Sequence, residues 1–414
     1  MLFIGRFPET VDKRRYLFHD GFASNLPGNA DRDGGTMKLS ISKVQLLIGL
    51  QRVQNVVERR TTMPILSNAL LKTDTDALSL SATDLEVGIQ SILPARIQEA
   101  GALTVRARSL LDIVRELPDT EVQIQSKDGN RVEIRANKSV FNVLALPAED
   151  FPEIPGFSSE ESQNFVRMNG TAIMSMLDKT LYAASTDEAR YHLNGVFFET
   201  LQEGQQRLFR MVATDAHRLS LVDTAEALFD NEAWRLFADG IIVPRKGLNE
   251  LRRLLAEGKD DFLVTIRGRM LFVKRDSIFL SMRLIEGKYA DYRRIIPDKT
   301  ALGVTLPREE LLASLKRISL MSSDKSRSVT FSLTPGSLQL SSQSPELGDA
   351  KEEISIDYSG EELRIGFNSR YLIDAVSTIE GENVHLELRG RQNPGVIRST
   401  TGPNHTSVVM PMRI

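Results

Sequence analysis

The sequence predicts an α+β protein made of three topologically similar domains, each with two helices on antiparallel sheets, and three observations support this fold class. The length of 414 residues fits about three domains of ordinary size. Two amphipathic helical patterns recur in each third of the chain, at a spacing of about 130 residues. Alternating apolar and polar runs between these helices are typical of strands with one buried face.

The first helix of each third is marked by apolar residues that recur along one helical face. Three segments share this pattern: 42–60, 171–185 and 307–321. In the first segment, Leu46, Leu50, Val53 and Val57 follow one another at steps of three or four residues. Pro307 suits the first position of the third helix, because an amide hydrogen is not needed there.

A second helix follows a short strand late in each third. These helices are predicted over 105–116, 244–257 and 369–380. Strands are predicted between the helices, over 77–81, 86–92, 121–125, 131–136, 196–199, 262–266 and 383–388. The last strand is expected within 407–414. Joining such units edge to edge hides their strand edges, and closing the set into a ring removes the edges altogether.

The pattern divides the chain into a leader and three domains. Residues 1–36 have no clear period and contain a stretch rich in Gly, Asp and Asn, so we interpret them as an N-terminal extension and assign them no function. The domains are predicted at 37–156, 165–297 and 298–414.

Composition excludes several classes of protein. Cys is absent, which rules out disulfides, catalytic thiolates and Cys-ligated metals. No apolar run approaches the ~20 residues of a membrane helix, and charged residues interrupt any signal-peptide core near the N-terminus. We therefore expect a cytoplasmic protein without membrane contact. The net charge is −3, so any binding of nucleic acid must use a local basic surface.

Basic charge is concentrated on the six predicted helices. Together they hold 16 Lys and Arg against 10 Asp and Glu. This surplus, with neutral donors such as Gln45, Gln51 and Asn249, favours sequence-independent contact with nucleic-acid phosphates. One alternative is that Lys and Arg merely solvate exposed helix faces. Another is an open scaffold that binds DNA through charge alone.

Signals for catalysis are weak. The sequence has no Walker A loop, Gly-rich dinucleotide turn or G-x-S-x-G elbow, and its five His lack metal-binding spacing. The tripeptide Ala-Thr-Asp recurs and places Asp84 and Asp215 at the ends of equivalent predicted strands. Two such carboxylates could bind Mg²⁺ in a metal-dependent nuclease, whereas a Thr-Asp pair also begins turns. We expect a non-enzymatic protein with no metal and no cofactor.

Six segments resemble a known family. They are Leu146–Pro152, Tyr191–Gly195, Val212–Leu219, Val243–Gly247, Asp291–Arg294 and Val408–Ile414. Each segment alone is weakly specific, but six in family order are highly specific. On them, residues 37–414, about nine tenths of the chain, resemble the bacterial DNA polymerase III beta subunit, the DNA sliding clamp.

The resemblance implies a fold, a function and partners. It implies three alike domains per subunit and a ring formed by a head-to-tail homodimer, with helices around the hole and sheets outside. Such a ring is a non-catalytic processivity factor that encircles duplex DNA without sequence preference. Its other partners would be the polymerase III alpha subunit, the clamp loader and repair polymerases, which bind through short linear peptides with Leu and Phe anchors.

The resemblance also implies three sets of site residues. The positions that match DNA contacts are Arg60, Arg108, Tyr191, Arg245 and Lys246. The positions that match apolar dimer contacts are Phe141, Val143, Leu320 and Met321. The positions that match a peptide groove between the second and third domains and the C-terminus are Leu193, Thr214, His217, Arg218, Leu219, Arg294, Ile295, Asn368, Tyr371, Val408, Met410, Pro411, Met412 and Arg413.

These residue types suit an adaptable apolar pocket, because Leu, Ile, Val and Met side chains repack easily. Arg218, Arg294 and Arg413 are expected at its rim, with their charged ends in solvent. Alternate residues of the terminal segment could instead belong to a core-packed edge strand.

The chain departs from the common family pattern near the groove. Ala216 stands where Gly is usual, and Ile414 stands where Leu is usual. Tyr289 and Ala290 stand where Phe and Pro are usual, which removes a rigid wall. Asp187 stands where the family can carry an amide, so no DNA contact is assigned to it.

Overall fold

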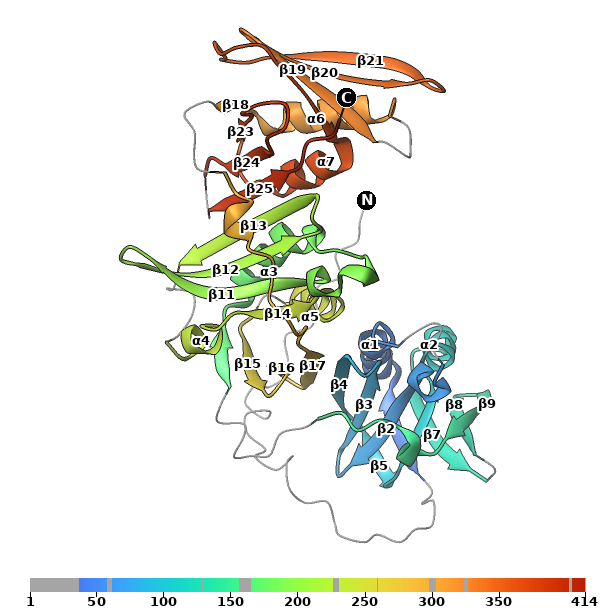
Figure 1. Ribbon diagram of the computed structural model, residues 1–414. Helices are drawn as coiled ribbons and strands as arrows, with labels where there is room; N and C mark the ends of the chain where they lie inside the picture. The colour runs from blue at the N-terminus through green and yellow to red at the C-terminus, as the bar shows by residue number, and fades with distance from the viewer. Residues whose placement is uncertain are drawn as a thin grey trace.

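The computed structural model describes residues 37–57, 62–128, 130–155, 165–225, 231–258, 260–297, 303–322, 327–401 and 404–413, with the backbone alone at 231–233. The predicted N-terminal extension, Arg60 and Ile414 lie outside these residues. The described chain forms three units that follow one another along a curved arc (Figure 1).

Six helices occur where the sequence pattern predicts them: α1 (Lys43–Gln54), α2 (Ala107–Glu116), α3 (Gly170–Thr180), α5 (Arg245–Glu257), α6 (Arg308–Ser319) and α7 (Ser369–Thr378). A short helix α4 (Asn231–Leu236) was not predicted. The predicted first helix was too long, because α1 ends at Gln54. Pro307 is the residue before α6 rather than its first residue, and it ends the preceding strand.

The helix starts are fixed by the local sequence. Asn169 and Asn368 stand before α3 and α7, and their side chains accept hydrogen bonds from the amides of Ala172 and Arg370 at 2.8 and 3.0 Å. Such caps satisfy amides that have no partner within the helix. In the first unit, Lys43 at the start of α1 donates to carbonyls at the end of α2, which ties the two helices together.

The strands of the first unit are β1 (Lys38–Ser42), β2 (Asn68–Asp74), β3 (Ala77–Thr83), β4 (Val87–Pro94), β5 (Arg96–Glu99), β6 (Ala102–Arg106), β7 (Glu121–Lys127), β8 (Arg131–Ala136) and β9 (Ser139–Leu146). Those of the second are β10 (Val166–Met168), β11 (Gly195–Glu203), β12 (Gln206–Thr214), β13 (Arg218–Ala225), β14 (Ile241–Pro244), β15 (Phe262–Arg267), β16 (Met270–Arg275) and β17 (Ile278–Arg283). Those of the third are β18 (Gly303–Pro307), β19 (Ser328–Thr334), β20 (Ser337–Ser344), β21 (Gly348–Ser355), β22 (Leu363–Asn368), β23 (Asn383–Glu387), β24 (Gly395–Ser399) and β25 (His405–Val409).

Two of the sheets continue from one unit into the next. Antiparallel pairing of β4 with β17 joins the first and second units in a 13-stranded sheet. Antiparallel pairing of β13 with β25 joins the second and third units in an 8-stranded sheet. A 4-stranded sheet, in the order β21-β20-β19-β22, lies within the third unit. The described strand pairs are all antiparallel, as the α+β prediction requires.

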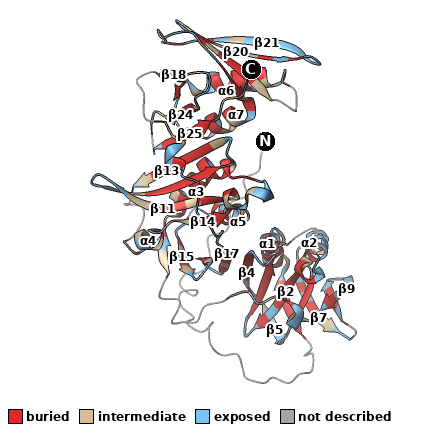
Figure 2. Ribbon diagram, viewed as in Figure 1, coloured by how far each residue is buried: buried red, intermediate tan, exposed pale blue. Residues whose placement is uncertain are grey.

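The helix pairs α1–α2, α3–α5 and α6–α7 pack against the sheets and bury the apolar face that the sequence predicts. Leu46, Leu50 and Val53 of α1 are all fully buried. At Gly49 a side chain would meet Leu93 at 2.5 Å, so the helix approaches the sheet more closely than any other residue would allow. Figure 2 shows buried residues between helices and sheets, and Figure 1 shows these paired helices on the inner side of the arc and α4 on its outer side. In the described residues, no helix is long and apolar enough to cross a membrane.

Candidate functional site

The turn between β12 and β13 begins the predicted groove. Thr214 Oγ1 donates to the carbonyl of Arg218 at 2.7 Å and accepts from the amide of Ala216 at 3.1 Å. Asp215 Oδ1 accepts from the amides of His217 and Arg218, each at 2.9 Å. Ala216 has φ +74°, a left-handed conformation that Gly adopts without strain and Ala does not. The turn exposes His217 at the surface.

The first unit contains the same turn between β3 and β4. Asp84 Oδ1 accepts from the amides of Glu86 and Val87 at 2.9 and 2.6 Å, and Leu85 has φ +77°. The repeated Thr-Asp pairs therefore close equivalent turns. No group of three or more His, Asp or Glu in the part of the chain that the structure describes could hold a metal ion. The geometry gives the alternative of a two-aspartate nuclease no support.

Arg218 connects the turn to the third unit. Its guanidinium donates to Asp215 Oδ2 at 3.0 Å, to Asp374 Oδ2 at 2.5 Å and to the carbonyl of Tyr182 at 2.6 Å. It also lies over the rings of Tyr182 and Tyr371, at 5.2 and 4.6 Å from their centroids. Arg218 was predicted to extend into solvent at the rim, but its side chain is only 11% exposed. Its donors are directed to acceptors inside the joint between the two units.

The floor of the groove is a separate apolar cluster on the 8-stranded sheet. The predicted residues Leu193, Leu219 and Val408 are buried in it, and Ile295 packs against it. Tyr289, which sequence reasoning marked only as a departure from the family, is buried there with its ring stacked on Phe197 at 5.0 Å between centroids. Burial raises the pKa of Tyr289 far above its usual value, so its hydroxyl is uncharged.

The C-terminal segment crosses the groove between two units. The amide of Met410 donates to the carbonyl of His217 at 2.9 Å, and the amide of Met412 donates to the carbonyl of Gly366 at 2.7 Å. Strand β25 ends at Val409, before Pro411, because Pro has no amide hydrogen to continue the ladder. The strand begins two residues before the expected window of 407–414 and occupies only the first three residues of that window. Met410 is 38% exposed, whereas Val408 and Val409 are buried between β13 and β24.

The other predicted groove residues lie around this segment. Tyr371 stacks on His217 with 6.5 Å between ring centroids. Asn368 caps α7, so its side-chain oxygen already has a partner. Arg294 and Arg413 are exposed, as expected for a rim. Sequence reasoning missed Tyr182 and Asp374, which hold Arg218, because no local pattern links residues that meet only when the units pack.

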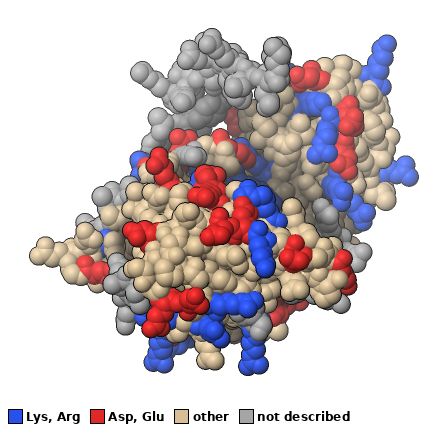
Figure 3. Space-filling model, turned by 90° about the horizontal axis from the view of Figure 1, so that it is seen from above, with Lys and Arg blue, Asp and Glu red and all other residues tan. Residues whose placement is uncertain are grey.

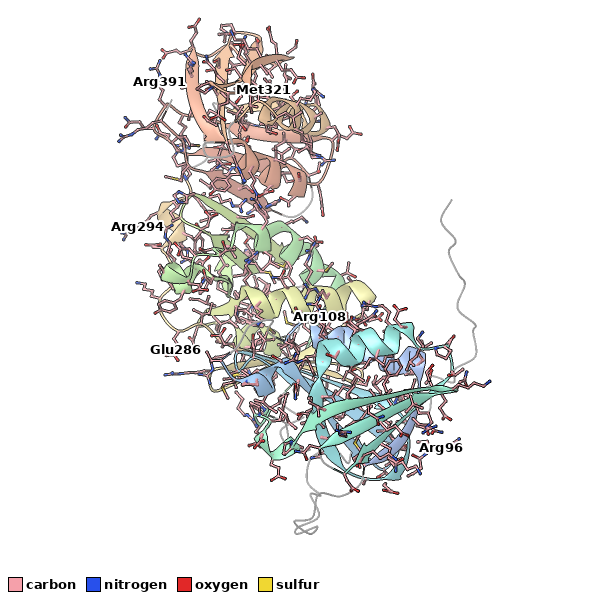
Figure 4. The ribbon with its side chains drawn as sticks, turned by 90° about the vertical axis from the view of Figure 1, so that its right-hand side faces the viewer. Arg96, Arg108, Glu286, Arg294, Met321 and Arg391 are labelled. Carbon is pink, nitrogen blue, oxygen red and sulfur yellow. The ribbon has the colours of Figure 1, made fainter. Side chains whose placement is uncertain are left out.

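Four of the predicted DNA-contacting residues lie in the part of the chain that the structure describes, and Arg60 does not. Tyr191, Arg245 and Lys246 line one open hollow of about 770 Å³ together with Asn194 and Asn249. Tyr191 is 58% exposed. Arg108 is exposed in the first turn of α2, and Figure 4 looks onto this helix-covered side. Three of the five predicted residues are thus brought together, and Arg108 lies on a neighbouring helix.

Ion pairs connect several helix cations to neighbouring acids. Lys246 of α5 pairs with Asp84 of the first unit, whose side chain is only 3% exposed. Arg52 of α1 pairs with Glu257 of α5 at 2.6 Å, across the same joint. In the third unit, the face seen in Figure 3 carries Lys and Arg interspersed with Asp and Glu. In these two pairs, cations of α1 and α5 already have acidic partners across the joint between the first and second units.

At the two ends of the arc, strand edges have no partner among the described residues. Strand β9 pairs with β8, but it meets β6 only at Ala145 and Leu146. Phe141 and Leu144 on it are 39% and 75% exposed. In the other end unit, β21 pairs with β20 along one edge. Leu320 near this strand is 75% exposed. Of the predicted dimer contacts, Met321 is half-buried and Val143 packs against the main core.

Three family models match consecutive parts of the chain, all of them from the DNA polymerase III beta subunit. The N-terminal domain matches residues 37–155, the central domain matches 167–291 and the C-terminal domain matches 293–413.

Individual relatives agree with the family models. The beta sliding clamp of Caulobacter vibrioides is 37% identical over 91% of this chain and 100% of its own length. That of Vibrio cholerae is 33% identical with the same coverage. A crystal structure of the Caulobacter crescentus clamp superposes with a TM-score of 0.86 at 36% identity, over 92% of this chain and all of that one. A clamp from Bartonella birtlesii bound to griselimycin gives 0.83 at 32% identity, over the same shares of the two chains. The chain therefore belongs to the DNA polymerase III beta subunit family, the bacterial sliding clamps.

Proposed function

We propose that two copies of this chain close head to tail into a ring that encircles duplex DNA and tethers polymerases through the groove. The observation that carries this proposal is the arc itself, because its helices lie inside, its sheets lie outside and each end has an unpaired strand edge. Pairing β9 of one copy with β21 of the other would give hydrogen-bond partners to the backbone groups at both edges.

Charge and apolar surface both support this pairing. The β8–β9 hairpin exposes Arg131, Arg135 and Lys138 beside the half-buried Glu133, whereas β21 exposes Asp349, Glu353 and one cation, Lys351. A basic edge therefore faces an acidic edge in a head-to-tail contact, and would repel a second copy of itself. The exposed Phe141, Leu144 and Leu320 supply the apolar centre that such an interface needs. Phe141, Val143, Leu320 and Met321 remain the proposed contacts.

Retention on DNA would come from enclosure rather than from tight binding. Six to ten direct phosphate contacts would weaken by about 10³–10⁵ between 50 and 200 mM salt, and they would also oppose sliding. A closed ring with a diffuse positive lining needs neither strong contacts nor base recognition. Arg60, Arg108, Tyr191, Arg245 and Lys246 are the proposed lining residues. The ring carries out no reaction of its own.

The groove would bind short peptides with apolar anchors. A buried Phe side chain removes about 150–250 Å² from water, which is worth roughly 4–6 kcal/mol before the costs of binding. Two anchors therefore reach about micromolar affinity, near −8 kcal/mol. Weak and exchangeable binding is what several partners need in order to share one groove.

A topological assay tests the ring. The protein is loaded by its clamp loader onto nicked circular DNA, washed at high salt, and the DNA is then linearised. We expect the protein to survive the wash and to leave the cut ends. Loss during the wash would support an open electrostatic scaffold instead. Cleavage of the DNA by pure protein with Mg²⁺ or Mn²⁺ would contradict the non-catalytic role.

A further inference from the structure

A row of charged residues crosses the outer face of the 8-stranded sheet. Glu199 of β11, Arg210 of β12 and Asp223 of β13 are direct neighbours in strand register. All three are buried, at 9%, 7% and 3% exposure. Arg210 donates to both carboxylate oxygens of Asp223, at 2.6 and 2.8 Å. Burial opposes the charge of Arg210, but the hydrogen bonds and attraction of Asp223 outweigh it and raise the pKa of Arg210.

The linker between β17 and β18 connects the second and third units, and the structure describes its residues 284–297. This linker is bonded to the charged row through Tyr292 and Arg293. Tyr292, which is 2% exposed, donates from its hydroxyl to Glu199 and accepts from Arg210 Nη1 at 3.2 Å. Arg293 donates to both oxygens of Glu199, at 2.9 and 3.0 Å, and lies 4.8 Å from the centroid of the Tyr292 ring. Burial raises the pKa of Tyr292 to about 12, so at neutral pH the hydroxyl remains a donor.

The adjacent row of the same sheet face is the groove floor. Phe197, Val212 and Leu221 lie in register on the three strands, two residues from the charged row. They belong to the apolar cluster of Tyr289 and Ile295. Side chains two residues apart on a strand share a face, so the charged row and the groove floor are contiguous.

Tyr292 links the two rows through the backbone of the linker. Its amide donates to the carbonyl of Ala290 at 2.7 Å, and its carbonyl accepts from the amides of Ile295 and Ile296 at 3.0 and 3.3 Å. The residues on either side of Tyr292 therefore keep their places relative to its ring. One of these neighbours, Ile295, packs against the groove floor.

The third unit reaches the same row. Asn404 donates from its side chain to Asp223 Oδ2 at 2.8 Å, and its carbonyl accepts from the amide of Asp223 at 3.0 Å. The charged row thus contacts the linker on one side and the neighbouring unit on the other.

We propose that Tyr292 is a positioning residue for the peptide groove: held by Glu199 and Arg210, it fixes the linker segment that walls the groove, so that peptide affinity depends on a hydroxyl outside the groove itself. This inference rests on the proposed function, because it assigns a determinant of affinity to the same groove.

The test replaces Tyr292 by Phe, which keeps the ring and removes the hydroxyl. Binding of a short fluorescein-labelled peptide with Leu and Phe anchors is measured by fluorescence polarisation. We expect Kd to rise about tenfold, the size of one hydrogen bond to a charged partner, while retention on circular DNA stays unchanged. Tyr358→Phe is the matched control, because its hydroxyl also donates one hydrogen bond, to the carbonyl of Glu361 at 2.7 Å, at a place that contacts neither the row nor the groove.

A second variant distinguishes positioning from general destabilisation. Glu199→Leu removes the acceptor of the same hydrogen bond, so adding Tyr292→Phe to it should weaken binding no further than Glu199→Leu alone. If Tyr292→Phe is unfolded at the assay temperature, Arg293→Gln tests the same row through a side chain that is 59% exposed, and we expect Kd to rise about threefold.

The outcomes separate the inference from the function it rests on. An unchanged Kd for folded Tyr292→Phe, or an equal loss in Tyr358→Phe, would overturn the positioning role while leaving the groove in place. Additive losses in the double variant would also overturn it. Failure of the unaltered protein to bind the peptide would contradict the proposed function, and the inference with it.

Discussion

His405 makes the stability of this protein dependent on pH. The residue lies on β25, opposite Val222 of β13, at the joint between the second and third units. Ser220 Oγ donates to the carbonyl of Lys179 at 2.5 Å and therefore accepts from His405 Nε2 at 3.1 Å. Within the described part of the chain, Nδ1 of His405 is buried without a hydrogen-bond partner. Protonation of His405 would place a positive charge in this buried site, near the charge of Lys179.

Burial and the charge of Lys179 lower the pKa of His405 from 6.5 to about 3. The unfolded chain takes up a proton below pH 6.5, whereas the folded chain does so only near pH 3. Stability is therefore complete above pH 6.5 and is lost as the pH falls through the window between these values. Between pH 7 and pH 5 the loss amounts to about 2 kcal/mol, at 1.36 kcal/mol per pKa unit.

The assay compares urea unfolding of the protein and of His405→Gln at pH 7 and pH 5. The other His are common to both proteins, so their contributions cancel. We expect the unaltered protein to lose about 2 kcal/mol more than the variant over this range. In parallel, the ring proton of His405 should show no NMR titration above pH 5. A titration midpoint near 6.5, or equal pH dependence of the two proteins, would refute the reasoning.

Three further predictions concern the turn, the edges and the C-terminus. Ala216→Gly should raise the free energy of unfolding by about 0.5–1 kcal/mol, because φ is +74° there, and a lower thermal midpoint would contradict this. Phe141→Asp should give monomers in sedimentation, since it buries a charge in the proposed interface; dimers at micromolar concentration would argue against β9 as the edge. Removing Met410–Ile414 should abolish peptide binding yet keep the dimer, because β25 ends at Val409; full affinity would place the groove elsewhere.

Much of the fold follows from local patterns in the sequence. The helical faces are local, so Leu46, Leu50 and Val53 indicate α1 without any knowledge of the sheet. The end of α1 at Gln54 is not encoded in that way, because the apolar period continues to Val57. The window for the terminal strand was placed too far toward the C-terminus, although Pro411 was a signal that the strand would stop before it.

The site was less accessible to sequence reasoning. Its residues were found through resemblance, yet the contacts that position them join residues far apart in the chain. Arg218 meets Asp374 across 156 positions, and no periodicity predicts such a pair. The pair of Arg210 and Asp223 could have been predicted from the sequence. Both residues interrupt apolar strands that are neighbours in the sheet. Buried charges on adjacent strands usually pair with each other.

Continuous sheets across the joints have a mechanical consequence. Bending the chain between its first and second units means breaking the ladder of β4 and β17, and the other joint is held in the same way by β13 and β25. Each subunit is therefore a rigid arc and not three domains joined by flexible linkers. In a ring of two such subunits, the contact between the subunits should open more easily than either joint within a subunit. We therefore expect DNA to enter the ring between the two chains.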